Sequence, residues 1–332
     1  MDELQAGPFV DDLDQPEWRP RQRWSTLAFI LQSKSSAISL LIIIVFVVVA
    51  ILAPLLAPQD PWKFSFKRNL PPAWVQQSAR PGEAQYPLGT DTLGRDIASR
   101  LIYGARTALF VALLAAPLAA IFGTLIGLVA GYAGGRVESM LMRGTDIFNA
   151  FPAIMFTIAV VLILRDSPLN KPLNGVLVLV IAFVLIGWVS LARIVRGAVL
   201  AQKQELYVEA ARQLGLSHSR ILFRHILPNC LALIIVWLMA AISRVIILEA
   251  FLGYVGVEVS GAERGLQFAA TSGLEFAATS WGGLFFEGRA LIHANPIVLL
   301  APSVCVILVA VSFTLLGDRL RDALDPRLRS MT

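Results

Sequence analysis

Charged side chains are scarce in this sequence. Asp, Glu, Lys and Arg make up 15% of the 332 residues, while apolar types make up 56%. The mean hydropathy is +0.69. A soluble domain of ordinary composition is about 25% charged and about 45–50% apolar, so this chain lacks the polar surface that a soluble multidomain protein needs. The composition indicates several membrane spans.

Cysteine and histidine are also rare. The two cysteines, Cys230 and Cys305, lie inside apolar runs, and the three histidines are His218, His225 and His293. A disulfide framework or a thiolate metal site needs more cysteines, or partner histidines at close spacing. We interpret both cysteines as small packing residues and expect no metal ion in this chain.

Common motifs of nucleotide binding and catalysis are missing. The sequence contains no GxxxxGK[ST], no HExxH and no GxSxG, so it lacks a P-loop for ATP phosphates and two common hydrolytic centres. The run GTDTLGRD contains Asp91, Arg95 and Asp96. We interpret these residues as helix caps and surface ion pairs rather than as a catalytic carboxylate pair, and we predict a non-enzymatic protein without a cofactor of its own.

Long apolar stretches are what the chain has instead. A span needs about 20 apolar residues, because each adds about 1.5 Å across a hydrocarbon core of about 30 Å. The third and fifth candidate stretches are short, and we expect the fifth to continue past Arg244 and Glu249 to about Gly253. The sequence predicts an all-α integral membrane protein with six spans, at residues 35–59, 107–135, 147–164, 172–192, 226–243 and 294–317.

The first of these stretches is predicted to be an uncleaved anchor. Its apolar run is too long for the core of a signal peptide, and a 34-residue tail precedes it. The expected division of the chain is a tail at 1–34, an anchor at 35–57, an outer segment at 58–106, a five-span core at 107–317 with an inner loop at 193–228 and an outer loop at 254–293, and a tail at 318–332.

Lys and Arg indicate the orientation. They occur in both tails and in the connections after spans two and four. With six spans these regions share one side, which the positive-inside rule makes cytoplasmic. We therefore place both termini in the cytoplasm, and we interpret the net charge of +5 as a mark of topology rather than of nucleic-acid binding. Residues 58–106 hold several basic residues against this pattern, but long loops translocate largely regardless of charge.

The outer loop contains a direct duplication. The copy GLQFAATS, residues 265–272, is followed at once by GLEFAATS, residues 273–280. Two copies of eight residues are too few for a solenoid. We interpret them as an insertion that lengthens the loop, with a contact for an external partner as the alternative.

Glycines recur every fourth residue in the second span. Such spacing places them close to one helical face, and small residues let two helices approach closely in lipid. We predict that these glycines form a helix-packing seam, a line of close contact with another helix. They are Gly123, Gly127, Gly131 and Gly135.

Two ionisable residues fall inside the extended fifth span. Arg244 and Glu249 are five positions apart and so do not share one helical face. Counted from Ile226, Arg244 would lie about 27 Å along the helix, near the outer interface. Interfacial anchoring and lining of the outer pathway both remain open for this pair.

A helix-rich, charged stretch separates spans four and five. The sequence YVEAARQLGLSHSRILFRHILPN, residues 207–229, is longer than a simple connector. Gly215 is suited to ending a first helix in the left-handed conformation. Ser217 is suited to capping a second helix at residues 219–227, before Pro228 begins the next span. The pattern predicts a cytoplasmic helix–turn–helix against which another protein packs.

This stretch resembles the EAA loop of ABC importer permeases. EAA, three residues, Gly and a later ILP form the pattern, and RHILPN at 224–229 is similar to the peptide-transport branch. The branch also matches, in order, YPLGTDTLGRDIASRLIYGARTAL at 86–109, GYAGGRVESMLMRGTDIFNAFP at 131–152, LARIVRG at 191–197 and LGDRLRDALDPR at 316–327. The resemblance covers about residues 86–327. The family member that the sequence resembles is the C-type subunit of a B/C permease pair. The duplicated loop departs from the family, which has a short segment there.

The resemblance implies a type I ABC importer transmembrane fold and a set of partners. These are a second, homologous permease, two cytoplasmic ATPases that bind ATP and Mg, and a periplasmic substrate-binding protein at the inner membrane of a bacterium. It further implies an ATPase-docking coupling loop that includes Tyr207, Glu209, Ala210, Ala211, Gly215, Leu216, Arg220 and Arg224. Arg244, Glu249 and Trp281 are the candidates for the pathway or its outer mouth.

The solute and two rival functions stay open at this point. Similar permeases serve dipeptides, oligopeptides, nickel chelates, glutathione and peptide antibiotics. An ion-gradient-driven secondary transporter favours midplane carboxylates and internal inverted repeats, and an intramembrane enzyme needs paired Asp, Ser–His or metal ligands within its spans. The sequence shows none of these features, so the expected function is one half of an ATP-driven importer that works by alternating access.

Overall fold

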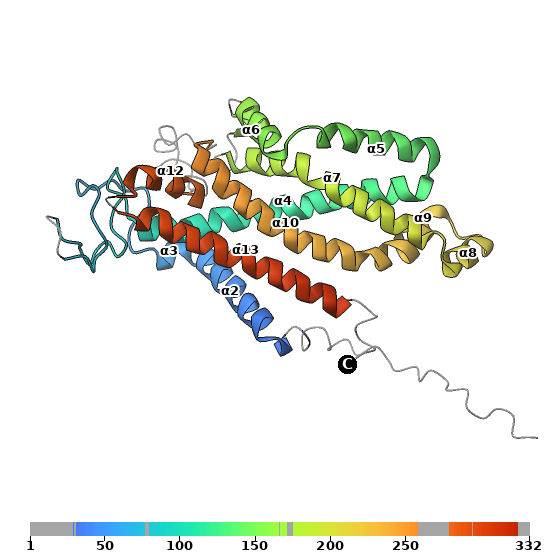
Figure 1. Ribbon diagram of the computed structural model, residues 1–332, viewed down its shortest axis with the longest axis horizontal. Helices are drawn as coiled ribbons and strands as arrows, with labels where there is room; N and C mark the ends of the chain where they lie inside the picture. Colours follow the sequence, from blue (N-terminus) through green and yellow to red (C-terminus); the bar gives the residue numbers. More distant parts are fainter. Residues whose placement is uncertain are drawn as a thin grey trace, which may run out of the picture.

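The helices form one elongated bundle. The computed structural model describes residues 29, 31–76, 80–165, 167–170, 175–257, 279–293 and 295–324. Helices α8 and α9 lie at one end of the bundle, and α12 lies at the other (Figure 1). The elements are α2 (Lys34–Ile51), α3 (Ala53–Leu56), α4 (Ile97–Ala133), α5 (Gly135–Asn149), α6 (Ala153–Leu164), η1 (Pro168–Asn170), α7 (Val176–Gln202), α8 (Leu206–Gln213), α9 (His218–Arg220), η3 (Ile221–Ile226), α10 (Leu227–Val255), α12 (Trp281–Leu291) and α13 (Ile297–Leu324).

The predicted all-helical membrane architecture is confirmed. Within the described ranges, five helices are long and apolar enough to cross a membrane: α2, α4, α7, the run His218–Val255 and α13. The bent pair α5–α6 can supply a sixth crossing. The duplicated loop lies outside the described residues, apart from Thr279 and Ser280 of its second copy.

Several helices exceed the bounds that apolar runs alone predict. Helix α4 begins at Ile97, inside the expected outer segment, because Asp96 caps it by accepting a hydrogen bond from Ser99 N (2.8 Å). Helix α7 continues to Gln202, well into the expected inner loop. Charged residues end a hydropathy run but do not end a helix that leaves the lipid. The predicted continuation of the fifth span is confirmed, since α10 reaches Val255.

The third span is not the straight helix that the sequence predicts for 147–164. Helices α5 and α6 meet at an angle of 84°. Pro152 occupies the N-cap position of α6, where its ring cannot extend α5. Helix α6 alone has 12 residues, which at 1.5 Å per residue is about 18 Å, too short for a hydrocarbon core of about 30 Å.

Helices α4 and α7 share the most extensive contact between two helices of the described residues, and glycine makes it possible. A Cβ atom on Gly127 would lie 2.6 Å from the carbonyl oxygen of Ala192, and one on Gly123 would lie 2.6 Å from that of Trp188. A Cβ on Gly131 would meet Val199 at 2.7 Å. Gly135 does not belong to this seam, because a Cβ there would meet nothing within 4 Å. It is the first residue of α5, beyond the end of α4.

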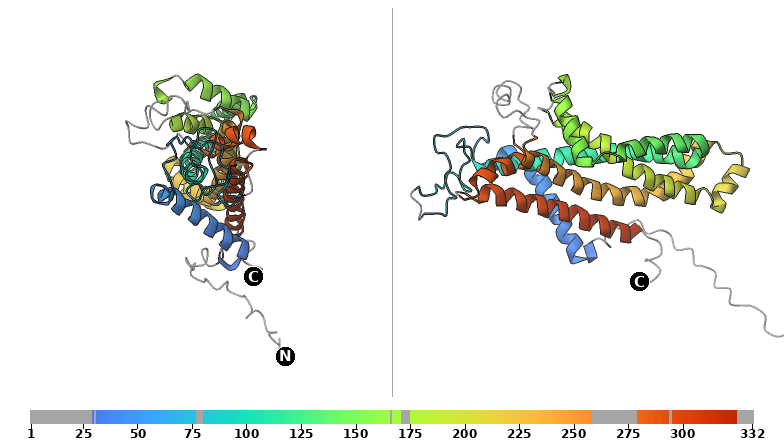
Figure 2. Two further views of the ribbon diagram at one scale, coloured as in Figure 1. Left: turned by 90° about the vertical axis from the view of Figure 1, so that its left-hand side faces the viewer. Right: turned by 45° about the horizontal axis from the view of Figure 1, so that its top comes forward.

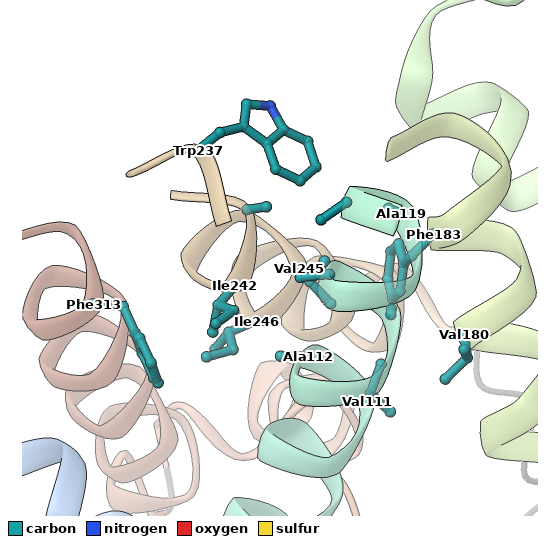
Figure 3. Packing of buried hydrophobic residues seen from close by; sticks show 14 of the residues in the cluster. Val111, Ala112, Ala119, Val180, Phe183, Trp237, Ile242, Val245, Ile246 and Phe313 are labelled. Atoms are coloured by element: carbon teal, nitrogen blue, oxygen red, sulfur yellow. The ribbon is translucent and has the colours of Figure 1, made fainter. Parts of the chain in front are cut away.

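The remaining spans pack around this pair. Helix α10 contacts α4, α7 and α13, and α2 crosses obliquely over α13 and α4 (Figure 2). Side chains from α4, α7, α10 and α13 point into a common core (Figure 3). The core includes Val111, Ala112, Ala119, Val180, Phe183, Ile242, Val245, Ile246 and Phe313.

We predict that Gly127→Val destabilises the protein, because the new side chain must displace the backbone of α7. Such overpacking costs about 1–3 kcal/mol. Thermal unfolding of the purified complex in detergent measures the loss. Gly144→Val is the matched control, because a Cβ at Gly144 in α5 meets nothing within 4 Å. Equal losses in both variants would show that β-branching, and not the α4–α7 approach, causes the effect.

Candidate functional site

The stretch between α7 and α10 folds as the predicted hairpin in its first half. Helix α8 ends where Gly215 takes a φ of +73°. The amide of Gly215 donates to Arg212 O (2.9 Å), and the amide of Leu216 donates to Ala211 O (3.2 Å). This pair of bonds is the Schellman motif, which satisfies the last carbonyls of a helix. The left-handed helix stop predicted at Gly215 is therefore confirmed.

The second half of the hairpin differs from the prediction. Residues 219–227 do not form a separate helix, because α9 runs through the π-helical η3 directly into α10. Ser217 stands at the N-cap position, but its side chain makes no capping hydrogen bond. The π-helical turn ends at Ile226, two residues before Pro228. A proline disrupts the regular hydrogen-bond ladder one turn earlier, and a π-bulge absorbs that disruption without ending the helix.

The hairpin has a buried side and an exposed side. Val208, Ala211 and Ile221 are buried, whereas Leu206 and Leu214 are 87% and 80% exposed. Of the residues predicted to meet an ATPase, Leu216 is half-buried and packs on the core, and Ala211 is inside the hairpin. The others lie on the exposed side: Tyr207, Glu209, Ala210, Gly215, Arg220 and Arg224.

Polar contacts tie the hairpin to the end of α4. The Tyr132 hydroxyl lies 2.9 Å from His218 Nδ1, and Lys203 Nζ donates to the Tyr132 carbonyl (2.7 Å). The Arg212 guanidinium lies over the Tyr132 ring, 5.9 Å from its centroid. Tyr132 of α4 thus contacts α8 through Arg212, α9 through His218 and the end of α7 through Lys203. Sequence reasoning did not single out Tyr132, although it belongs to the GYAGG run that matches the family.

A second set of contacts joins the hairpin to α7 and α10. Tyr207 donates to Gln202 Oε1 (2.5 Å), and Asn229 donates to both Tyr207 Oη (3.0 Å) and the His225 carbonyl (2.8 Å). Nearby, Arg193 of α7 pairs with Asp146 of α5 at 2.7 Å. The hairpin is therefore hydrogen-bonded to α4, α7 and α10.

The opposite end holds a cluster of four charges. Asp91 Oδ2 accepts from Arg95 Nε (2.7 Å) and from Arg100 Nη1 (2.5 Å). Both arginines also pair with Glu287 of α12, at 2.5 and 2.6 Å. The interpretation of Asp91 and Arg95 as a surface pair is wrong, since Asp91 is fully buried. We call Asp91, Arg95, Arg100 and Glu287 the buried charge cluster.

Electrostatics explains why this cluster is stable as a unit. Burial alone would raise the pKa of Asp91, but Arg100 and Arg95 outweigh burial and hold that pKa below its ordinary value. For Asp96, burial dominates and raises the pKa above the ordinary value, although bonds to Ser99 oppose it. The capping role predicted for this region applies to Asp96. Sequence reasoning missed Glu287, because an isolated acid in a loop gives no sign of partners so far away along the chain.

The three candidates for the pathway lie in different environments. Trp281 is fully buried, donates to the Leu101 carbonyl (3.0 Å) and stands edge-on to Phe46 at 5.9 Å. Glu249 is buried as well. Both side chains are buried in this chain, and their assignment to the pathway or its outer mouth stays a prediction. Arg244 is exposed and lies over the Trp237 ring, 5.4 Å from its centroid.

Comparison with known proteins gives consistent matches along the chain. The family model "Binding-protein-dependent transport system inner membrane component" matches residues 123–330. The model "N-terminal TM domain of oligopeptide transport permease C" matches residues 27–72.

Similar relatives are permeases of transport systems. The dipeptide transport system permease DppC of Haemophilus influenzae is 34% identical over 90% of this chain and 92% of its own length. The oligopeptide transport system permease OppC of Bacillus subtilis is 33% identical over 90% of this chain and 87% of its own. The glutathione transport system permease GsiD of Pectobacterium atrosepticum is 37% identical over 73% of both chains.

We predict that Asp91→Asn destabilises the protein strongly, because it leaves two buried arginines with one carboxylate. Removing one partner of a buried pair costs about 3–5 kcal/mol. Thermal unfolding in detergent at neutral pH measures the change. Glu83→Gln, which breaks the exposed Lys67–Glu83 pair (2.6 Å), is the matched control and should have no measurable effect.

The same cluster predicts a direction of pH dependence. A lowered folded pKa means that the contribution of Asp91 is complete above its unfolded pKa of about 3.9. The contribution disappears as the pH falls through the still lower folded value. Asp91→Asn should therefore flatten the acid limb of the stability–pH curve. An unchanged acid limb would show that other carboxyls cause the loss.

Proposed function

Because the chain belongs to the family of binding-protein-dependent transport system inner membrane components, we propose that the solute it carries is a peptide or a peptide-like molecule. The chain is a C-type permease subunit of a dipeptide- or oligopeptide-type ABC importer, as the family models and its relatives show. That membership leaves the ion-gradient alternative without support. The peptide proposal rests on relatives named for dipeptides, oligopeptides and glutathione.

The exposed side of the hairpin is the surface on which a cytoplasmic ATPase docks. The observation that carries this part of the proposal is the pair Leu206 and Leu214, which are large, apolar and almost fully exposed at one end of the bundle. Exposed apolar groups outside lipid favour contact with another protein. The charged residues Glu209, Arg220 and Arg224 of the same hairpin are exposed as well. Two ATPases complete the importer, one on this chain and one on its partner.

A second, homologous permease completes the pathway, and a periplasmic binding protein delivers the solute at the opposite end. One chain leaves a side of α10 open, as described below, and a second permease would enclose it. The outer segment 58–96 and α12 then face the binding protein. The inner membrane of a bacterium is the location that the family description supports.

The arrangement of the helix ends supports an orientation with both termini in the cytoplasm. The start of α2 and the end of α13 point toward the half of the bundle that holds α8 (Figure 1). If α8 meets a cytoplasmic ATPase, both termini are cytoplasmic. The basic residues of the tails and inner loops support the same orientation.

Alternating access follows from how the hairpin is braced. Closure of the ATPase pair moves the two docked hairpins. Tyr132, Tyr207 and Asn229 bond this hairpin to α4, α7 and α10, so its movement reorients three spans together. The ATPases thereby shift the population between inward-open and outward-open states.

We predict that Gly215→Val uncouples ATP hydrolysis from transport. A β-branched residue strains the left-handed conformation that Gly215 adopts, and the helix stop shifts although space around it is open. Solute uptake and ATPase activity in proteoliposomes measure the coupling. Gly215→Asn is the control, because asparagine tolerates this conformation. Full transport by the valine variant would exclude the coupling role of Gly215.

We predict that Leu214→Asp releases the ATPases while the membrane bundle stays folded. The side chain is exposed, so the charge disturbs docking and not the core. Affinity purification of the chain from its host, with quantification of co-purified ATPase, measures the loss. Phe66→Asp is the matched control, because Phe66 is a fully exposed apolar residue in the outer segment. Equal ATPase recovery from both variants would place the docking surface elsewhere.

A further inference from the structure

Arg244 stands within α10 on a side that this chain leaves uncovered. Helix α10 lies in front of α4 and between α7 and α13 (Figure 1). Four exposed residues of α10 are spaced three or four apart, which places them on one side of the helix. We call these residues the uncovered stripe: Arg244, Ile247, Phe251 and Tyr254.

Lipid is a poor cover for Arg244. Leu227 starts α10 about 25 Å before Arg244, and Val255 ends it about 16 Å beyond. Arg244 therefore lies well inside α10, whereas the sequence placed it near the outer end of the span. A charge deep in a bilayer costs about 2.5–3.5 kcal/mol on insertion scales. Arg244 forms no ion pair with any residue that the structure describes, and its neighbour is the Trp237 ring at 5.4 Å.

The surroundings of Arg244 are polar as well as aromatic. Trp237 donates from Nε1 to Ser190 Oγ of α7 (3.1 Å), and Ser190 is itself exposed. A guanidinium, an indole and a hydroxyl therefore lie together where α7 and α10 meet. Arginine prefers carboxylates, which it binds through two parallel hydrogen bonds, and stacking on an aromatic ring holds its plane in place.

We propose that Arg244 binds a carboxylate of the transported solute as the solute passes along the uncovered stripe. This inference rests on the proposed function and adds the chemical group that is recognised within the membrane. The occupant is an anionic solute such as a peptide with a free C-terminus. The acidic residue of α10 itself, Glu249, is buried and does not compete on the stripe.

A second arginine stands at the outer end of the same helix. Arg289 of α12 is exposed and lies over the Tyr254 ring at 5.0 Å and over the Phe286 ring at 4.5 Å. Tyr254 belongs to the uncovered stripe, so the stripe runs from one aromatic-backed arginine to another. Arg289 receives the carboxylate first, and Arg244 receives it deeper in the membrane.

The test compares uptake of tri-alanine with uptake of its C-terminal amide by the whole importer in its native host. We expect Arg244→Gln to reduce tri-alanine uptake by roughly tenfold or more, the range for a charged hydrogen bond. Uptake of the amide should change little. Wild type and variant share one binding protein, so the change in the acid-to-amide ratio reports the permease alone. Arg244→Lys keeps the charge, and we expect it to restore part of that ratio.

Arg321→Gln is the matched control, because Arg321 is an exposed arginine in the last turn of α13. It should leave the acid-to-amide ratio unchanged. An equal loss of both peptides in Arg244→Gln, with less second permease co-purifying, would overturn the inference and assign Arg244 to an ion pair between subunits. An equal loss of both peptides with intact assembly, or no loss at all, would overturn it too. If the wild-type importer takes up neither peptide, the peptide function itself fails.

Discussion

The close approach of α4 to α7 is the constraint on which the rest of the structure depends. Gly123, Gly127 and Gly131 leave no room for a side chain between the two backbones. In lipid, helices gain little from hydrophobic burial, so tight packing supplies much of the attraction between them. Because α7 leads directly into the hairpin and α4 ends at Tyr132, this contact also fixes where α8 projects. The packing of α4 against α7 therefore sets the position of the hairpin.

The two ends of the bundle are held by different forces. At the hairpin end, the contacts are the hydrogen bonds of Tyr132 and Asn229 and the charged contacts of Lys203 and Arg212 with Tyr132. At the other end, Asp91, Arg100 and their partners form a buried charge cluster that also fixes α12. Hydrogen bonds of this kind are worth about 1–3 kcal/mol each, whereas breaking a buried ion pair costs about 3–5 kcal/mol. The hairpin end is therefore the more easily rearranged one.

Much of this fold could be predicted because lipid imposes simple rules. Apolar runs located the spans, and Gly215 marked the helix stop, since few residues other than glycine adopt that conformation readily. The 84° bend between α5 and α6 and the continuity through η3 could not be predicted from hydropathy. Both depend on local hydrogen bonding beside a proline. Glu287 and Tyr132 were missed because their roles arise from partners distant in sequence. The burial of Trp281 could not be predicted, because an aromatic residue in a loop looks the same in the sequence whether buried or exposed.

The unbroken helix from His218 to Val255 acts mechanically as a lever. Its 38 residues extend about 57 Å, so a small tilt at the hairpin becomes a larger lateral displacement at the far end. The bent pair α5–α6 has no such stiffness and would absorb the same push as a change of its angle. Under the proposed function, a movement of α8 would be transmitted along this helix toward Arg244 and the uncovered stripe. The continuous helix His218–Val255 and the bent pair α5–α6 would therefore respond differently to the same movement.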